Sequence, residues 1–273
     1  MPTSALLLAL AAAFVHAFWN LILARARDPQ AATAVALVVA VVVFAPVAIV
    51  VGGVERDVWP YLVVTSFLQL VYFVLLVAAY RRAELSIVYP IARGVAPVLV
   101  LVAGAVVLGR ATSWTQAVGV LVVAGGVILI RGLHVRGDWL GVGLGLVIAG
   151  VIASYTLVDK DGIRFARPVT YLELSMIVPA LAFAAGVVAS RGRAALRAEL
   201  GPASFAAGVA TFTAYALVLA ALERASAASV AAVRETSVVI ATGLAAVVLH
   251  ERVTGWRFAG AVLVVAGVAL LSL

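Results

Sequence analysis

The sequence predicts an all-α integral membrane protein with ten transmembrane helices, arranged as two inverted five-helix repeats around a central cavity. Three observations support this. Hydrophobic residues make up 66 % of the chain, charged residues only 11 %, and the mean hydropathy is +1.21, too much apolar surface for a soluble domain to cover. Charges gather between apolar segments of about 18 to 24 residues, the length that spans roughly 30 Å of hydrocarbon. Finally, the second half of the chain repeats the first.

The apolar segments follow one another with short connections, so any activity is expected within or across the bilayer. The net charge of +7 comes from arginines beside the spans, where they set topology, and no nucleic-acid partner is expected. The predicted spans are residues 4–23, 31–51, 60–80, 84–108, 114–131, 139–159, 169–189, 203–223, 226–249 and 256–273.

The repeat is visible by direct comparison at an offset of 142 residues. Residues 121–125 and 263–267 are identical, and a connection matches in register: Arg110, Thr112 and Trp114 recur as Arg252, Thr254 and Trp256. Residues 1–134 and 135–273 are therefore expected to form one five-span repeat each. An odd number of spans inverts one repeat relative to the other, a plan common among transporters with a substrate site near the midplane.

The end of the second half reads Leu249-His250-Glu251-Arg252-Val253-Thr254, followed by Gly260-Ala261 and Ala266-Gly267. This ending is similar to that of EamA domains, and the five-plus-five plan resembles the drug/metabolite transporter superfamily. The size and the aromatic-rich inner spans resemble the YddG-type amino-acid exporters of bacteria. The resemblance implies a multi-pass protein of the bacterial inner (plasma) membrane that exports small metabolites, above all aromatic or other neutral amino acids, by alternating access.

The orientation in the membrane stays open at this point. Arginines are more numerous in the connections after odd-numbered spans, and the positive-inside rule then places both termini outside. The family resemblance implies instead that both termini lie in the cytoplasm.

Charges inside two spans mark the first candidate site residues. An ionisable residue at the centre of a span costs about 3 kcal/mol on insertion scales. We therefore expect Arg93 in span 84–108 to be paired or to face water or a ligand. The repeat offset places it opposite Glu235, which follows Arg234 in span 226–249. We expect Arg93 and Glu235 to face each other across the pseudo-twofold axis, which leaves one cation for a substrate carboxylate. A purely structural ion pair is the alternative.

Aromatic and polar residues of other spans are expected to line the cavity. His16, Trp19 and Asn20 share one helix face at i, i+3 and i+4, and Trp19 corresponds in the repeat to Tyr155, beside Ser154. Tyrosines offer a flat apolar wall and can hold an ammonium by cation–π contact. Interhelical packing is the alternative role for each. The remaining substrate-binding candidates are Gln69, Tyr72, Tyr89 and Tyr215.

Two prolines, Pro90 and Pro97, lie inside span 84–108. Each removes a backbone donor and kinks a helix, so both are candidate hinges of the transport cycle. A static bend satisfied by neighbouring helices is the alternative.

Other function classes find less support. There is no Gly-x-Ser-x-Gly elbow, no metal-ligand spacing among three histidines and no nucleotide loop, so no cofactor is expected. An intramembrane lipid-modifying enzyme is the alternative from another class, and a different metabolite or a drug is the alternative substrate. The expected partners are a small-molecule substrate and the lipid bilayer, with the monomer as the functional unit.

Overall fold

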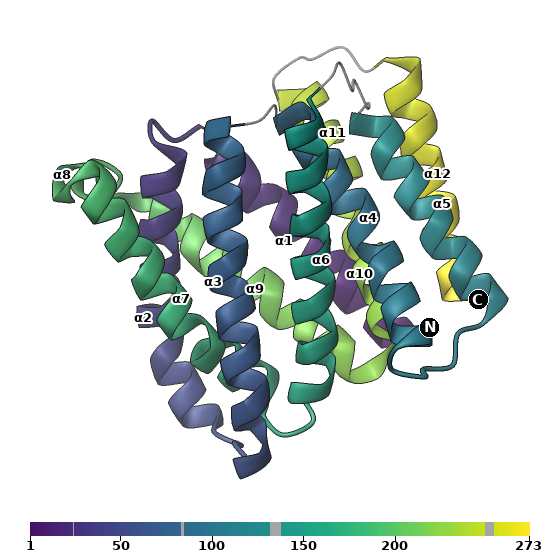
Figure 1. Cartoon of the computed structure of the whole chain (residues 1–273), viewed down its shortest axis with the longest axis horizontal. Coiled ribbons are helices and arrows are strands. Elements are labelled where there is room, and N and C mark those ends of the chain that lie inside the picture. The colour runs from purple at the N-terminus through teal and green to yellow at the C-terminus, as the bar shows by residue number, and fades with distance from the viewer. Residues whose placement is uncertain (24, 83–84, 132–137, 249–253) are drawn as a thin grey trace.

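The structure is a computed structural model that describes residues 1–23, 25–82, 85–131, 138–248 and 254–273. Its helices run up and down through one bundle (Figure 1). Over these residues, nine helices are long and apolar enough to cross a membrane, and a shorter apolar helix covers Trp114–Ile130. The helices are α1 Thr3–Leu23, α2 Pro29–Val51, η1 Arg56–Val58, α3 Trp59–Arg82, α4 Leu85–Val106, α5 Trp114–Arg131, α6 Trp139–Gly162, α7 Pro168–Arg191, α8 Arg193–Ala198, α9 Pro202–Arg224, α10 Ala227–Arg234, α11 Thr236–Val248 and α12 Gly255–Ser272.

The two halves interlock by exchanging contacts. Helix α1 of the first half packs on α9 and α11 of the second, while α6 of the second half packs on α3 and α4 of the first. Helix α2 packs against α7, and α5 against α12. Exchanging the two halves reproduces this set of contacts, as two inverted repeats related by a twofold axis require.

Helices α5 and α12 lie side by side (Figure 1) because glycines remove the side chains between them. A Cβ added to Gly126 would lie 2.7 Å from the carbonyl oxygen of Gly260. A Cβ added to Gly260 would likewise lie 2.7 Å from the carbonyl oxygen of Gly126. Lipid supplies no hydrophobic drive between helices, so close backbone approach at small residues provides the packing energy.

The predicted ninth span corresponds to the apolar stretch Ala227–Leu244, which the structure divides into α10 and α11, meeting at Glu235. The Thr236 hydroxyl donates to the Val233 carbonyl at 2.8 Å, and the Val238 amide bonds the carbonyl of Glu235, three residues before it, at 3.0 Å. These short-range bonds compete with the regular helical pattern and interrupt it. By contrast, α4 continues through Pro90 and Pro97.

Contacts between the halves close the end at which α6 passes into α7. The Glu55 amide donates to the Phe165 carbonyl at 2.8 Å, and the Arg167 amide donates to the Gly53 carbonyl at 3.1 Å. We call this pair of contacts the α2–α7 closure. The Met1 amino group donates to the Leu271 carbonyl at 2.8 Å, so the first residue lies against the end of α12.

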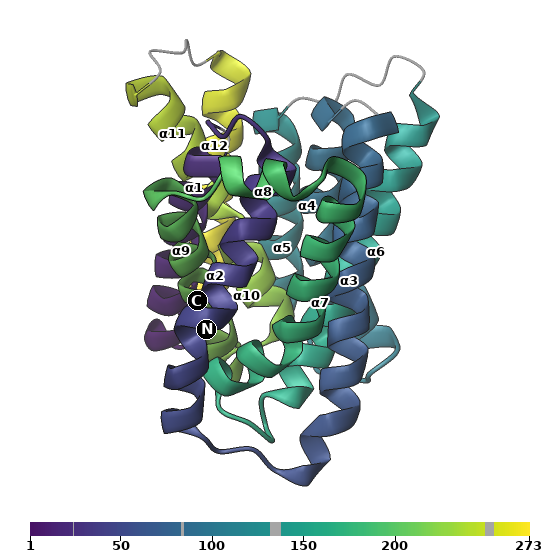
Figure 2. The same cartoon turned by 90° about the vertical axis from the view of Figure 1, so that its left-hand side faces the viewer.

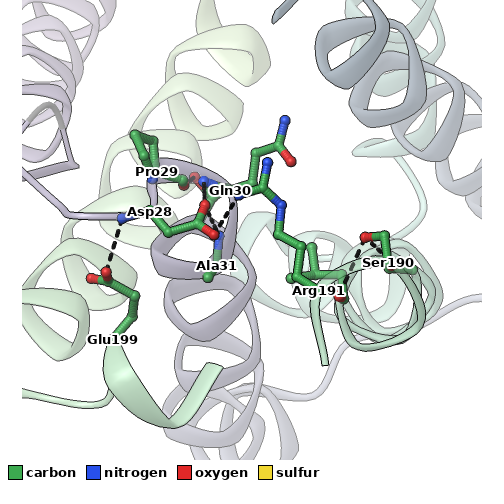
Figure 3. Close-up of polar contacts among 10 residues, drawn as sticks. Asp28, Pro29, Gln30, Ala31, Ser190, Arg191 and Glu199 are labelled. Atoms are coloured by element: carbon green, nitrogen blue, oxygen red, sulfur yellow. Dashed lines mark hydrogen bonds and ion pairs between the residues drawn. The ribbon is translucent and has the colours of Figure 1, made fainter. Parts of the chain in front are cut away.

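The opposite end carries a tie between the halves, beside α8, which lies across that end of the bundle (Figure 2). Asp28 caps α2 by accepting bonds from the amides of Gln30 (3.1 Å) and Ala31 (3.2 Å). The same carboxylate pairs with Arg191 at 2.5 Å, and the Asp28 amide donates to Glu199 at 2.9 Å (Figure 3). Partial burial opposes ionisation of Asp28, but the Ala31 amide and the Arg191 guanidinium outweigh it and lower the pKa of the Asp28 carboxyl.

Candidate functional site

An ion pair between the halves lies inside the bundle. Arg93 of α4 approaches Glu235, at the break between α10 and α11, with 2.9 Å between Nε and Oε2. Their exposed fractions are 8 % and 1 %. Arg93 also donates to the Ser237 hydroxyl at 3.4 Å, and Nε of Arg234 lies 3.9 Å from Oε1 of Glu235. The structure therefore brings together the three charges expected from the repeat, and α10 lies in the interior in both views (Figure 1 and Figure 2).

Several buried polar atoms of this group lack an aligned hydrogen bond to any residue that the structure describes. They are Nε of Arg93, Nε of Arg234 and Oε2 of Glu235, together with Nε1 of Trp19. The Arg93–Glu235 contact thus has the distance of an ion pair without the alignment of a hydrogen bond. A buried donor left unsatisfied costs about 1–3 kcal/mol, so Nε1 of Trp19 and Nε of Arg234, which lies 3.9 Å from the nearest Glu235 oxygen, are suited to a polar ligand.

Three tyrosines form an aromatic wall beside the charges. Tyr155 of α6 meets the edges of Tyr72 of α3 and Tyr215 of α9, with ring centroids 6.3 Å and 6.2 Å away. Tyr89 lies one turn before Arg93 on α4, and Tyr72, Tyr89 and Tyr155 are all within electrostatic range of Arg93. Edge-to-face packing fixes the rings while leaving hydroxyls beside the charged groups.

Helix α1 adds its predicted polar face. His16 and Trp19 pack edge to face with centroids 5.0 Å apart, and His16 is within electrostatic range of Arg93 and Arg234. The Asn20 side chain donates to the His16 carbonyl at 2.9 Å, so part of its bonding capacity is used within its own helix.

One predicted member does not join the group. Ser154 is exposed, and its hydroxyl donates to the Gly150 carbonyl of the same helix at 2.8 Å. Adjacent residues of an α-helix point about 100° apart, so Ser154 cannot share the face that Tyr155 turns inward. Gln69 is buried, with 7 % exposed, three residues before Tyr72 on α3.

Asp159, the last residue of the predicted span 139–159, is a buried acid that the sequence analysis did not single out. Helix α6 extends past it, and only 1 % of Asp159 is exposed. Its Oδ1 accepts hydroxyl bonds from Thr65 (2.6 Å) and Tyr171 (3.0 Å), and its Oδ2 accepts one from Tyr215 (2.5 Å). Three donors from α3, α7 and α9 satisfy an ionised carboxylate.

Asp159 changes the charge balance expected at the site. It lies within electrostatic range of Arg234 and shares Tyr215 with the aromatic wall. The cations Arg93 and Arg234 are therefore accompanied by two anions, Glu235 and Asp159. In the sequence, the run Asp159-Lys160-Asp161 is typical of a charged connection, although all three residues belong to α6.

Glu173 of α7 is a second buried acid that sequence reasoning passed over. It is 4 % exposed, and neither carboxyl oxygen has a hydrogen-bond partner in the described part of the chain. The signal was available, because a lone ionisable residue inside the predicted span 169–189 merits the same attention as Arg93.

A pocket of about 510 Å³ lies away from the charged group, between the chain termini, the start of α5 and the junction of α9 with α10. It is therefore not the predicted central cavity. Its lining includes Met1, Ser113, Gln116, Arg224, Ser226 and Leu271.

Comparison with known proteins agrees with this architecture. A model described as the EamA-like transporter family matches residues 3–132 and 139–273. A solved structure described only as "Crystal structure of protein" superposes with a TM-score of 0.80 over 100 % of this chain and 99 % of that one, at 17 % identity, a likeness of fold alone. No curated protein matches the sequence. Of the ending that carried the resemblance, residues 249–253 lie outside the described residues. Since the family model covers nearly the whole chain, this multi-pass membrane protein belongs to the EamA-like transporter family.

Proposed function

We propose that the protein is a secondary transporter that exports aromatic or other neutral amino acids by alternating access. The observation that carries the proposal is the buried group of Arg93, Arg234 and Glu235, with unsatisfied polar atoms beside an aromatic wall. Residues 1–134 and 135–273 act as the two repeats that move relative to each other.

The chemistry of the group suits a zwitterion. A substrate carboxylate would bind Arg93 and Arg234, since guanidinium groups are the preferred partners of carboxylates. The ammonium would lie toward Asp159 and the faces of Tyr155 and Tyr215. The two cations and two anions of this group balance, so a substrate without net charge leaves the buried site neutral, whereas a net cation or anion does not.

The helix break supports a moving site. Broken helices at the substrate site are common in transporters built from inverted repeats. The C-terminus of α10 and the N-terminus of α11 present opposite partial charges at Glu235. We infer that this break, with Pro90 and Pro97 of α4 as hinges, lets the site face each side in turn.

The remaining features of the proposal follow the family. The protein works as a monomer in the inner membrane of a bacterium, resembles the YddG-type exporters, and uses neither a cofactor nor an enzymatic step. A member of this family carries its substrate unchanged, so the molecule released on one side of the membrane is the same as the molecule bound on the other side.

The test is exchange in proteoliposomes. Vesicles loaded with unlabelled phenylalanine and leucine are given labelled phenylalanine, leucine, lysine or glutamate outside. We expect exchange of the two neutral amino acids and little exchange of lysine or glutamate. Absence of exchange for every amino acid would overturn the substrate class.

A pair of variants assigns the exchange to the site. Arg93→Ala should lower exchange by about 10- to 100-fold, because a hydrogen bond to a charged group contributes about 1.5–3 kcal/mol. Arg56→Ala, in the exposed η1 turn, is the matched control and should leave exchange unchanged. Equal rates in the two variants would contradict a role for Arg93 in binding.

A further inference from the structure

Glu173 is a buried carboxyl group that the proposed transport site does not use. It is the sixth residue of α7, about 8 Å along the helix from Pro168 at 1.5 Å per residue. Only 4 % of it is exposed, and both carboxyl oxygens lack a hydrogen-bond partner among the described residues.

The other buried acids in the described part of the chain are compensated. Glu235 faces Arg93 at 2.9 Å, and Asp159 accepts three hydroxyl bonds. An ionised carboxylate without any such partner is strongly disfavoured in an apolar interior, where the group neutralises instead. Burial without a partner therefore favours the neutral form of Glu173 in this conformation.

Among the side chains that the structure describes, the helices packed against α7 offer no counter-charge to Glu173. Helix α2 has no titratable residue. The described titratable residues of the other neighbouring helices are engaged elsewhere or lie near helix ends, and no charged group is within electrostatic range of Glu173. On α3, Tyr61 stacks on Phe165, and Tyr72 belongs to the aromatic wall. On α9, Tyr215 is bound to Asp159, and Glu223 pairs with Arg224. On α7 and α8, Tyr171 is bound to Asp159 and Arg191 is bound to Asp28, and the remaining residues are Arg193 and Arg197.

Glu173 lies one turn inside the α2–α7 closure. Thr170, three residues before it, donates to the Gly52 carbonyl at 2.8 Å, and residues at i and i+3 share a helix face. Val169, four residues before Glu173, lines an apolar pocket of about 350 Å³ between α2, α7 and α9. This open apolar groove runs beside the place where α2 and α7 must separate for this end to open.

We propose that Glu173 is a proton-binding site that couples the α2–α7 closure to protonation. The group keeps its proton while this end is closed, and releases it to water when α2 and α7 part. Deprotonation then opposes reclosure, because closing would bury an unpaired charge. This proposal rests on the alternating access of the proposed function but on no particular substrate.

The chain contains no cysteine, which allows a direct test by single-cysteine labelling in proteoliposomes. Ala48, 5 % exposed and bonded through its carbonyl to Thr170, is replaced by cysteine as a reporter of opening. Maleimide labelling of Ala48→Cys is divided by that of Asp57→Cys, an exposed position, to remove the pH dependence of the thiol itself.

The normalised labelling rate should rise with pH by up to about tenfold per pH unit, the limit for one proton. Glu173→Gln should abolish this rise, and Glu223→Gln, at an exposed carboxyl of α9, should leave it unchanged. Glu173→Met is a second neutral variant in case the glutamine variant does not fold. A rise that persists in the neutral variants, or labelling independent of pH in the parent, overturns the proposal. Since no substrate is added, failure of amino-acid exchange is a separate outcome.

Discussion

Arg93 and Glu235 stand 142 positions apart, at equivalent places in the two repeats, and their side chains form a buried ion pair of 2.9 Å. Equivalent residues near a twofold axis face each other, so identical charges there would repel. Opposite charges turn the same geometry into an attraction between the halves. The pair therefore joins the repeats at the point where the second repeat has a broken helix and the first a continuous one.

The first prediction concerns this pair. Arg93→Glu and Glu235→Arg should each abolish exchange and destabilise the protein by about 3–5 kcal/mol, because each leaves buried charges uncompensated. The double variant should recover stability and part of the exchange. Thermal unfolding in detergent and proteoliposome exchange measure the two effects. A double variant as damaged as the single ones would show that the two side chains do not act as a pair.

The second prediction concerns Asp159. Replacing it with asparagine keeps the shape but removes the charge that accepts bonds from Thr65, Tyr171 and Tyr215. We expect the free energy of unfolding to fall by about 2 kcal/mol. Each hydrogen bond to a charged group contributes roughly 1 kcal/mol more than one to a neutral group, and relaxation of the site recovers part of the sum. Asp57→Asn, at an exposed position, is the control for thermal unfolding. Equal melting temperatures for both variants would contradict the satisfied carboxylate described above.

The third prediction separates the ring of Tyr155 from its hydroxyl. Tyr155→Phe keeps the edge contacts with Tyr72 and Tyr215, so the protein should remain folded and exchange phenylalanine. Tyr155→Ala loses two aromatic contacts worth about 0.5–1.5 kcal/mol each. Its KM for phenylalanine should rise by about tenfold, with a smaller change for alanine as substrate. An equal change for both substrates would indicate general damage to the fold.

The fourth prediction concerns pH at the tie beside α8. The lowered pKa of Asp28 means that its contribution to stability is present above the unfolded pKa of about 3.9 and lost as pH falls through the folded value. The melting temperature of Asp28→Asn should therefore be lower than that of the parent protein at pH 7. This difference in melting temperature should vanish as the pH falls below about 3.9. Thermal unfolding from pH 7 to pH 3 provides the measurement. A difference independent of pH would mean that the charge of Asp28 does not stabilise the tie.

Much of the fold was predictable because lipid imposes strong rules on sequence. Each span must be apolar over a fixed length, and every backbone group must be bonded internally. These rules predicted the membrane-spanning helices to within a few residues of their ends, but not the short helices η1 and α8. They did not predict the break at Glu235, because it arises from bonds between a few neighbouring groups such as Thr236 and Val233, and the hydropathy of span 226–249 does not record them.

The candidate site was predictable where the repeat supplied a partner. Arg93 and Glu235 could be paired because the offset of 142 placed them opposite each other, and Trp19 and Tyr155 followed from a similar comparison. The prediction that Ser154 lines the cavity was wrong, because the rotation of a helix about its axis decides which of two neighbouring residues faces inward. Nothing equivalent was available for Asp159 or Glu173, whose repeat counterparts carry no charge.

The sequence by itself determined that this protein crosses the membrane many times, that its two halves are related, and that ionisable residues lie inside the spans. Only the tertiary structure decided which of those residues have partners. Asp159 lies where three hydroxyl groups of other helices converge, whereas none of the described residues forms a hydrogen bond with the Glu173 carboxyl group. The reason is physical: the cost of a buried charge depends on the few atoms around it, and those atoms come from helices far apart in the chain.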